Sequence, residues 1–443
     1  MTTHHPLLDA PVARTILRLS APNVASLVAV TLTVGYDGYL IGRLGTDALA
    51  GVSLVLPLSM LMMQVAGAGI GGGVASSIAR AITAGRHQYA ETLALHAMVL
   101  AAVLGLLAGG AALLFGPMLY KLLGGRGATL GYAEAYALPV MGCTVVPWLL
   151  NTAGAIYRGT GNMKLPALSM VACGLGHVLL GPLLVFGWGP VPAFGVTGAG
   201  LSLIVLYGVA GIVVVFLLTR PDAPLRLRRQ GLHWRTFGAL LAVGAPAAVS
   251  PVLSNACVLV LTGFAGVFGT AALAGYGIGS RLEYILIPLS FGVGSTLMTL
   301  VGMNVGAGRV VQAKRTAWIG SLMVAAMTGG AGLLVAVWPE AWTGFFASDP
   351  AVRGAGMVYL RIVGPFYSLF GFGLAMFFAS QGAGRMGWPL AASALRLSCV
   401  VFAGAAVAHA AGGSLSSLAW VVGASFSIYA LVIGAAVRFA EWR

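Results

Sequence analysis

The chain has 443 residues, of which 8% are charged and 59% are apolar, and its formal net charge is +14. Soluble domains carry about 25% charged residues, so this composition excludes a soluble enzyme with a fully hydrated surface. The lysines and arginines lie between apolar stretches rather than in a dense basic arm, which argues against nucleic-acid binding. The sequence therefore predicts a protein embedded in a membrane.

Apolar stretches recur along the chain at about 20 residues each, enough for a helix to cross about 30 Å of hydrocarbon. Backbone groups in lipid must be paired within the protein, and the stretches lack the two-residue alternation of a barrel, so helices are expected. The first half predicts spans near 20–42, 52–79, 93–119, 132–156, 165–187 and 196–219. The second half predicts spans near 237–265, 276–303, 316–338, 355–380, 388–410 and 415–438. The fold class is thus an all-α polytopic membrane protein with twelve transmembrane helices.

The loop charges predict the orientation of these spans. With a cytoplasmic N-terminus, the inner side holds seventeen basic residues and the outer side holds four, Arg43, Lys121, Arg126 and Arg353. The inner set is Arg14, Arg18, Arg80, Arg86, Arg158, Lys164, Arg220, Arg226, Arg228, Arg229, Arg235, Arg309, Lys314, Arg315, Arg385, Arg438 and Arg443. Both termini are therefore expected in the cytoplasm. The N-terminus has no compact signal peptide with a cleavage site, so the first span is expected to direct insertion.

The two halves of the sequence repeat each other at a nearly constant offset. Pro22 and Pro246 are 224 residues apart, as are the strings GTDALAG and GTAALAG. After a slip of one residue, AGR at Ala84 matches AGR at Ala307, Tyr136 matches Tyr359, and Gly159, Gly161 and Pro166 match Gly382, Gly384 and Pro389. Six spans per half is an even number, so the halves form a parallel repeat. We expect lobes at 1–219 and 237–443, a basic cytoplasmic linker at 220–236, and the alternating central cavity of a transporter.

At these blocks the sequence resembles the multidrug and toxic compound extrusion (MATE) family, from about Leu19 to Phe439. The strings that carry the resemblance are YDGYLIGRLGTDALAG, YRGTGNMKLP, VGMNVGAGR and SQGAGRMGWP, in that order along the chain. The resemblance implies two six-helix lobes and export of amphipathic, often cationic, small molecules in exchange for H⁺ or Na⁺. A lipid-linked or amphipathic substrate flippase of the same superfamily remains the alternative function.

Two other classes are disfavoured. The major facilitator superfamily also has two six-span halves, but its basic signature between the second and third spans is absent from this chain. A membrane receptor or assembly factor is disfavoured because the longest connector is too short to form a soluble domain. The chain also lacks a nucleotide-binding motif, so ATP-driven pumping is not expected.

Three acids are candidates for positions within membrane depth, namely Asp37, Glu283 and, near a span end, Glu134. A buried carboxylate is costly unless it is paired or neutralised. Low dielectric favours the protonated form, so such a group can carry a proton between two aqueous faces. Asp37 also matches the acid that the family carries in a pattern resembling Asp-x-x-x-x-Gly-x-Leu-Gly, which makes it the main ion-coupling candidate. The alternative is a carboxylate near the interface that positions the end of the first helix.

His177 is the second ion-coupling candidate, because it lies well inside the fifth span and an imidazole titrates near neutral pH. The family often shows an asparagine here and an aspartate four residues later, but this chain has His177 and Gly181. A network built on two acids would therefore have one acid and one imidazole, and His177 is expected to partner Asp37. A hydrogen-bonded packing histidine is the alternative.

Glu283, in the eighth span, is the third ion-coupling candidate, with Arg396 as the expected partner if their helices are adjacent. A structural ion pair between them is the alternative. Gln64, Asn151 and Asn255 are candidates for lining a substrate cavity, with interhelical hydrogen bonding as their other role. Pro22 is a candidate hinge, unless it occupies the first helical turn, where proline costs little.

The remaining expectations concern partners and location. The four cysteines fall inside predicted spans without metal-ligand spacing, so neither a metal site nor a disulfide is expected. No cofactor is expected beyond the coupling ion, for which H⁺ is preferred over Na⁺ because the second lobe lacks a cluster of acids. The expected partners are small amphipathic or cationic substrates and membrane lipid. We expect a monomer in a bacterial inner membrane.

Overall fold

The computed structural model describes the whole chain except residues 1–5, 229, 411, 440 and 443. The first half contains α1 (Pro6–Asp9), α2 (Val12–Gly42), α3 (Thr46–Gln64), the π-helix η1 (Val65–Gly71), α4 (Gly72–Thr83), α5 (His87–Leu122), α6 (Gly127–Gly142), α7 (Val145–Gly159), α8 (Lys164–Phe186) and α9 (Val196–Thr219). The second half contains α10 (Trp234–Val267), α11 (Thr270–Gly306), α12 (Val310–Val337), α13 (Pro339–Phe346), α14 (Pro350–Val363), the 3-10 turn η2 (Gly364–Phe366), α15 (Tyr367–Gly382), α16 (Gly387–His409) and α17 (Leu415–Phe439). Within the described ranges the sole β feature is an isolated bridge between Trp188 and Val191, so the predicted all-α class is confirmed.

The helices also confirm the predicted number of spans. Among the described residues, eleven helical segments are long and apolar enough to cross a membrane. The pair α6 and α7, which is bent by 43° at a short break, brings the number to twelve when the two helices are counted as one span. The chain is a multi-pass membrane protein.

The first span begins earlier than the sequence predicted. Helix α2 starts at Val12 rather than near residue 20. Arg14 and Arg18 lie four residues apart and share one exposed face, while Ile16 is fully buried on another. An amphipathic helix can thus extend beyond the uniformly apolar segment through residues that include charged ones. Hydropathy alone does not detect such an extension.

By their internal contacts the residues form two compact units. One contains residues 21–248, and the other contains residues 1–20 together with 249–443. Two long helices, α2 and α10, each contribute residues to both units, and the divisions fall close to Pro22 and Pro246. The sequence predicted lobes at 1–219 and 237–443, with α2 and α10 each in a single lobe. This division stays a prediction.

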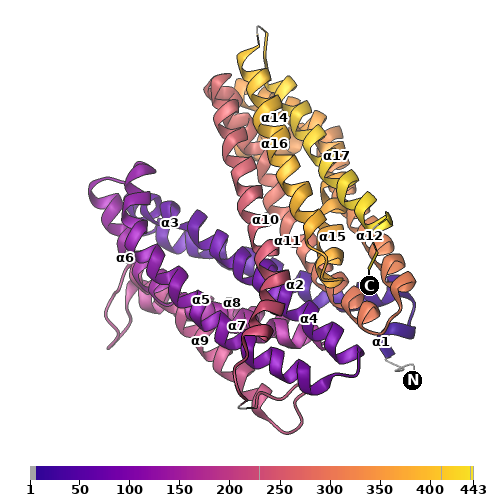
Figure 1. Cartoon of the computed structure of the whole chain (residues 1–443). Coiled ribbons are helices and arrows are strands. Elements are labelled where there is room, and N and C mark those ends of the chain that lie inside the picture. The colour runs from indigo at the N-terminus through magenta and orange to yellow at the C-terminus, as the bar shows by residue number, and fades with distance from the viewer. Residues whose placement is uncertain (1–5, 229, 411, 440, 443) are drawn as a thin grey trace. The chain divides into compact units, whose positions relative to one another are not determined.

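Each unit has its own apolar core. In the unit of residues 21–248, Ile41, Val52, Tyr120 and Tyr136 belong to a buried cluster contributed by α2, α3, α5 and α6. In the other unit, α15 packs against α11, α12 and α17 (Figure 1). The first turns of α2 also contribute to the apolar core of this unit, because Ile16 packs with Val293, Leu297 and Val324 of α11 and α12.

Glycine occupies the matching positions of the two halves for the same structural reasons. A Cβ on Gly159 would lie 2.8 Å from the carbonyl oxygen of Ala75, and one on Gly382 would lie 2.4 Å from that of Met298. Both glycines therefore permit close helix contacts. Gly161 and Gly384 follow them with φ of 87° and 74°, a conformation that favours glycine. The sequence repeat is thus a repeat of packing and turn geometry.

The glycine-rich stretch of the second span forms a π-helix that the sequence did not predict. Residues Val65–Gly71 adopt this geometry between α3 and α4. A Cβ on Gly69 would lie 2.7 Å from Cα of Ala248, and one on Gly73 would lie 2.8 Å from Cα of Gly244. The absence of side chains here allows the first part of α10 to approach the span closely.

Candidate functional site

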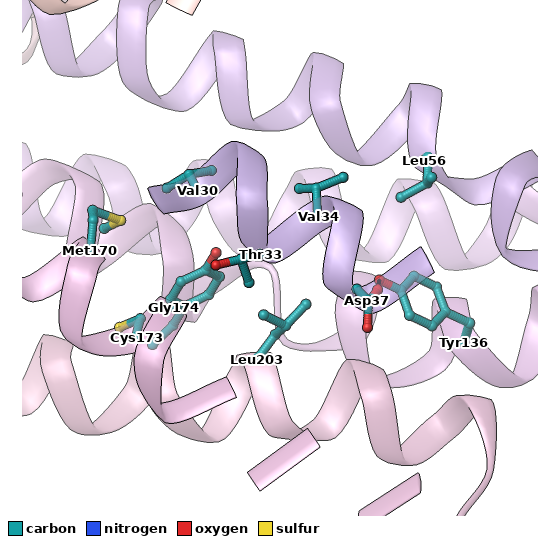
Figure 2. Close-up of a pocket in the computed structure, with 11 residues that line it drawn as sticks. Val30, Thr33, Val34, Asp37, Leu56, Tyr136, Met170, Cys173, Gly174 and Leu203 are labelled. Carbon is teal, nitrogen blue, oxygen red and sulfur yellow. Dashed lines mark hydrogen bonds between the residues drawn. The ribbon is translucent and has the colours of Figure 1, made fainter. Parts of the chain in front are cut away.

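The polar centre of the unit of residues 21–248 is the carboxyl group of Asp37 on α2, which is only 5% exposed. Tyr136 on α6 donates a hydrogen bond from its hydroxyl to Asp37 Oδ2 at 3.2 Å. Nε2 of His177, on α8, lies 3.3 Å from Asp37 Oδ1, and this histidine is fully buried. Figure 2 shows the side chains of Asp37 and Tyr136 pointing toward each other. Three helices thus bring an acid, a phenol and an imidazole together.

Ser202 on α9 contacts the other side of the His177 ring. Its hydroxyl oxygen lies 2.8 Å from the carbonyl oxygen of Ala199 and 2.7 Å from Nδ1 of His177. The hydroxyl has one proton for these two contacts, so Nδ1 is a donor in one tautomer of the imidazole and an acceptor in the other.

Asp37 and His177 are in contact without a hydrogen bond between them. Nε2 and Oδ1 lie 3.3 Å apart but are not aligned for one, and neither atom has a hydrogen-bond partner among the described residues. Two ionisable side chains thus meet in a buried place, where unsatisfied polar atoms are unfavourable.

A small cavity of about 60 Å³ lies beside this pair. Asp37 and Tyr136 line it together with Val30, Thr33, Val34, Leu56, Met170, Cys173, Gly174, Leu203 and Tyr207 (Figure 2). A water molecule needs about 10–15 Å³ of such space and several polar partners. The cavity therefore has room for water beside the carboxyl group, although most of its walls are apolar.

The departure from the family pattern at residue 181 is structurally explained. A Cβ on Gly181 would lie 3.3 Å from Cε1 of His177 and 3.0 Å from Cδ1 of Leu40. A side chain there would press on the imidazole. In this chain, glycine at 181 makes room for the histidine at 177.

The second unit also contains a buried acid. Glu283 on α11 is 8% exposed, and Tyr359 on α14 donates a hydrogen bond to its Oε1 at 3.4 Å. Arg396 on α16 is buried as well and interacts electrostatically with Glu283. The two are not among the ion pairs within 4 Å that the described residues form. The structure thus brings Glu283 and Arg396 into one cluster without a direct ion pair.

The two acids have a common feature that links the site to the repeat. Tyr136 and Tyr359, which match in the repeat, each donate a hydrogen bond to a buried carboxylate. The carboxylates themselves come from α2 and α11 and do not match each other. The repeated tyrosine was visible in the sequence and was the signal that could have identified both contacts, whereas nothing in the sequence indicated Ser202.

The other candidates lie elsewhere. Gln64 is half-buried at the start of the π-helix, Glu134 is exposed, and Asn255 is exposed with its amide bound to the carbonyl of Pro251 at 2.8 Å. The amide of Asn151 binds the carbonyl of Pro147 at 3.0 Å and contacts Sδ of Met63 at 4.0 Å. None of these residues lines the cavity beside Asp37.

Pro22 lies well inside α2, so the alternative that it occupies the first helical turn is wrong. The helix begins ten residues earlier than Pro22, because its apolar face includes Ile16. All four cysteines are free thiols. No cluster of three or more histidine, cysteine or acidic side chains suited to a metal ion occurs within the described ranges.

Comparisons with known proteins agree with this architecture. The MatE family model matches residues 22–183 and again residues 246–407, so both matches begin at the repeated prolines. A relative named "FAD transporter" from Shewanella oneidensis is 26% identical, over 80% of this chain and 78% of its own length. The probable multidrug resistance protein NorM from Thermotoga maritima is 25% identical, over 84% of this chain and 80% of its own length.

Solved structures show the same fold. A MOP superfamily transporter from Pyrococcus furiosus superposes with a TM-score of 0.88 at 22% identity, covering 98% of this chain and 96% of that one. A mutant of the Vibrio cholerae MATE transporter VcmN gives the same TM-score at 22% identity, covering 97% of this chain and 98% of that one. The family model covers both halves, and the chain belongs to the MatE family of multidrug and toxic compound extrusion transporters.

Proposed function

We propose that this chain is a secondary antiporter that exports amphipathic small molecules in exchange for protons, with Asp37 as the coupling carboxylate. The observation that carries the proposal is the contact of Asp37 Oδ1 and His177 Nε2 at 3.3 Å, since it brings a buried carboxyl group and an imidazole within reach of one shared proton. The multidrug relatives within the family support the export of small molecules. H⁺ is preferred over Na⁺, because a tight Na⁺ site needs several hard oxygen ligands and the pair offers one carboxylate.

The coupling cycle follows from what the proton does to this pair. With the proton bound, Asp37 and His177 attract each other and their helices, α2 and α8, pack closely. When the proton leaves, Asp37 is a buried carboxylate, so it draws water or a cationic group of a substrate from the adjoining cavity. Proton and cationic substrate then exclude each other at Asp37. Outside protons release substrate, and proton loss toward the cytoplasm resets the site.

The test is export by a variant that keeps the shape of Asp37 but cannot bind a proton. In inverted vesicles, Asp37→Asn should abolish dye accumulation driven by a pH gradient, while Asp37→Glu should retain part of it with a shifted pH profile. Asp47→Asn is the matched control, because Asp47 is an exposed acid just after the same helix. Separate H⁺ and Na⁺ gradients identify the coupling ion. Proton-driven export by Asp37→Asn at the wild-type rate and equal expression would remove Asp37 from the mechanism.

The alternative, a flippase for a lipid-linked or amphipathic substrate, is tested with the same vesicles. Movement of a fluorescent lipid between leaflets that is fast in wild type and slowed in Asp37→Asn would favour the flippase. Dye transport without lipid movement favours the exporter.

A further inference from the structure

The connector between α9 and α10 is packed on α5, within the unit of residues 21–248. Leu225 of this connector is only 2% exposed. The backbone N–H of Arg226 donates a hydrogen bond to Oε1 of Glu91 on α5 at 3.3 Å. Farther along, Thr92 of α5 hydrogen-bonds the side chain of Gln230 at 2.6 Å. The connector is therefore a docked segment of this unit.

His96, one turn farther along α5, makes the last contact before α10 begins. It is fully buried, and its Nε2 lies 2.8 Å from the backbone nitrogen of His233. Its Nδ1 lies 2.7 Å from the carbonyl oxygen of Thr92. A backbone N–H can only donate and a backbone carbonyl oxygen can only accept, so Nε2 is the acceptor and Nδ1 carries the proton. Both hydrogen bonds therefore require the neutral imidazole.

The ring of His96 also packs against the beginning of α10. Its centre lies 4.7 Å from that of the Phe237 ring. The ring of His233 stacks on it at 6.2 Å, with an angle of 18° between the two planes. One imidazole thus attaches both the end of the connector and the first turn of α10 to α5.

A second proton on this imidazole has no acceptor in the docked arrangement. A protonated Nε2 would face the N–H of His233, one donor against another, and the ring would carry a charge in a buried place. His233 is itself titratable, and two charged imidazoles at this distance repel each other. Protonation of His96 therefore favours detachment of the connector.

Charges of both signs surround this end of α5, so the hydrogen bonds of His96 decide which of its forms fits. Arg80 on α4 interacts electrostatically with Tyr89 of α5, and Tyr157 on α7 interacts with Asp222 of the connector. Among the described residues, the charged and titratable groups on the segments packed here are His87, Tyr89 and Glu91 of α5, Arg80 of α4, Tyr157 and Arg158 of α7, Asp222, Arg226, Arg228 and His233 of the connector, and Arg235 of α10.

We propose that His96 is a pH-sensitive clasp. The neutral imidazole holds the connector and the beginning of α10 on α5, and the protonated imidazole releases them. The loop charges predict that the connector is cytoplasmic, so the clasp responds to the pH of the cytoplasm. This inference goes beyond the proposed function, because the clasp is separate from Asp37 and operates whichever ion drives transport.

Thiol labelling of the connector measures its release. The protein is purified in lipid nanodiscs with its four native cysteines replaced by alanine. Leu225→Cys is buried while the connector is docked, whereas Asp222→Cys is exposed and corrects for the effect of pH on the maleimide reaction. From about pH 7.5 to about pH 5.5, where imidazoles titrate, the ratio of the two labelling rates should rise about five-fold or more, the effect of one buried hydrogen bond on an equilibrium.

Two replacements of His96 separate proton binding from hydrogen-bond acceptance. His96→Gln keeps an acceptor for the N–H of His233 but binds no proton, so the ratio should stay low at every pH. His96→Phe keeps a ring against Phe237 but has no acceptor, so the ratio should be high at every pH. His233→Gln is the matched control, because it removes the neighbouring imidazole and keeps the backbone N–H. It should retain the rise on acidification.

Four results would each overturn the clasp. They are a ratio that does not rise in the protein with His96, a rise that persists in His96→Gln, a rise that is lost in His233→Gln, and equal ratios in His96→Gln and His96→Phe. The last of these would show that the acceptor does not hold the connector. Neither a substrate nor a gradient is present in this assay, so its failure leaves proton-driven export by Asp37 to its own test.

Discussion

At the scale of single residues, Asp37, Tyr136 and His177 meet from three different helices. Tyr136 donates a hydrogen bond to one carboxylate oxygen of Asp37, and Nε2 of His177 lies 3.3 Å from the other. The two oxygens of one carboxyl group therefore have different neighbours, a phenol and an imidazole. The proposed function places the uptake and release of a proton at this carboxyl group.

Replacing His177 with glutamine tests whether this imidazole takes part in coupling. A glutamine amide can hydrogen-bond Asp37 but cannot bind a proton, so the pair loses one of its two ionisable groups. The pH at which export reaches its half-maximal rate should therefore differ from that of wild type. The measurement is the pH profile of dye efflux, with His87→Gln as control because His87 is exposed. A profile that stays in place would show that His177 only packs beside Asp37.

The sequence could identify some of these residues and not others. Asp37 and His177 stand out because ionisable side chains are costly inside apolar spans. Tyr136 stands out only through its match with Tyr359 in the repeat, and its hydroxyl partner cannot be known before α2 and α6 are packed. Asn151 and Asn255 were equally visible, yet each binds a carbonyl of its own helix, a partner that any helix offers four residues earlier.

At the scale of helices, α2 is the element that relates the site to the rest of the fold. It carries Asp37 near one end, and Pro22 lies at the point where its residues pass from one compact unit to the other. Proline removes one backbone hydrogen bond and clashes with the preceding turn, so a helix bends there more readily. Pro246 lies similarly close to the division within α10.

Pro22→Ala should therefore stiffen α2 at this division. Proline is about 3 kcal/mol less favourable than alanine inside a helix, so the variant should be at least as stable as wild type while its export slows. The measurements are the thermal midpoint and the initial rate of dye efflux under a pH gradient. Pro57→Ala is the control, because Pro57 lies inside α3, which belongs to one unit only. If Pro22→Ala exports at the wild-type rate with an unchanged pH profile, the hinge should be abandoned.

The helices themselves were largely predictable, because an apolar run of about 20 residues has few alternatives in lipid. The π-helix at Val65–Gly71 was not predicted, and the close approach of α10 to Gly69 and Gly73 depends on tertiary packing that the sequence does not display. The early start of α2 was missed for a related reason. Its first turns are amphipathic, and their apolar face is buried only after α11 and α12 have packed.

At the scale of the whole molecule, a repeated scaffold holds two different charge clusters. Matching tyrosines and glycines occur in both halves, but the first unit pairs its acid with a titratable imidazole and the second places its acid near a permanently charged arginine. The repeated packing therefore does not determine the group that lies beside each acid, and we propose coupling at the first cluster only.

The orientation of this scaffold in the membrane is predicted from the charges of the loops, seventeen basic residues against four. Because basic loops stay on the cytoplasmic side, the connector between α9 and α10 should be cytoplasmic and the loop between α8 and α9 should be external. Asp222 and Pro190 are exposed residues of these two segments. In a background with the four native cysteines replaced by alanine, a membrane-impermeant maleimide should label Pro190→Cys in intact cells.

Asp222→Cys should react with the same reagent only after the cells are opened, because the reagent then reaches the cytoplasmic side. Labelling of both positions in opened cells is the control that each thiol is accessible to the reagent. Ready labelling of Asp222→Cys in intact cells, with Pro190→Cys protected, would reverse the orientation. Because protons that flow inward drive an exchanged substrate outward in either orientation, this experiment tests the topology and leaves the proposed direction of export unchanged.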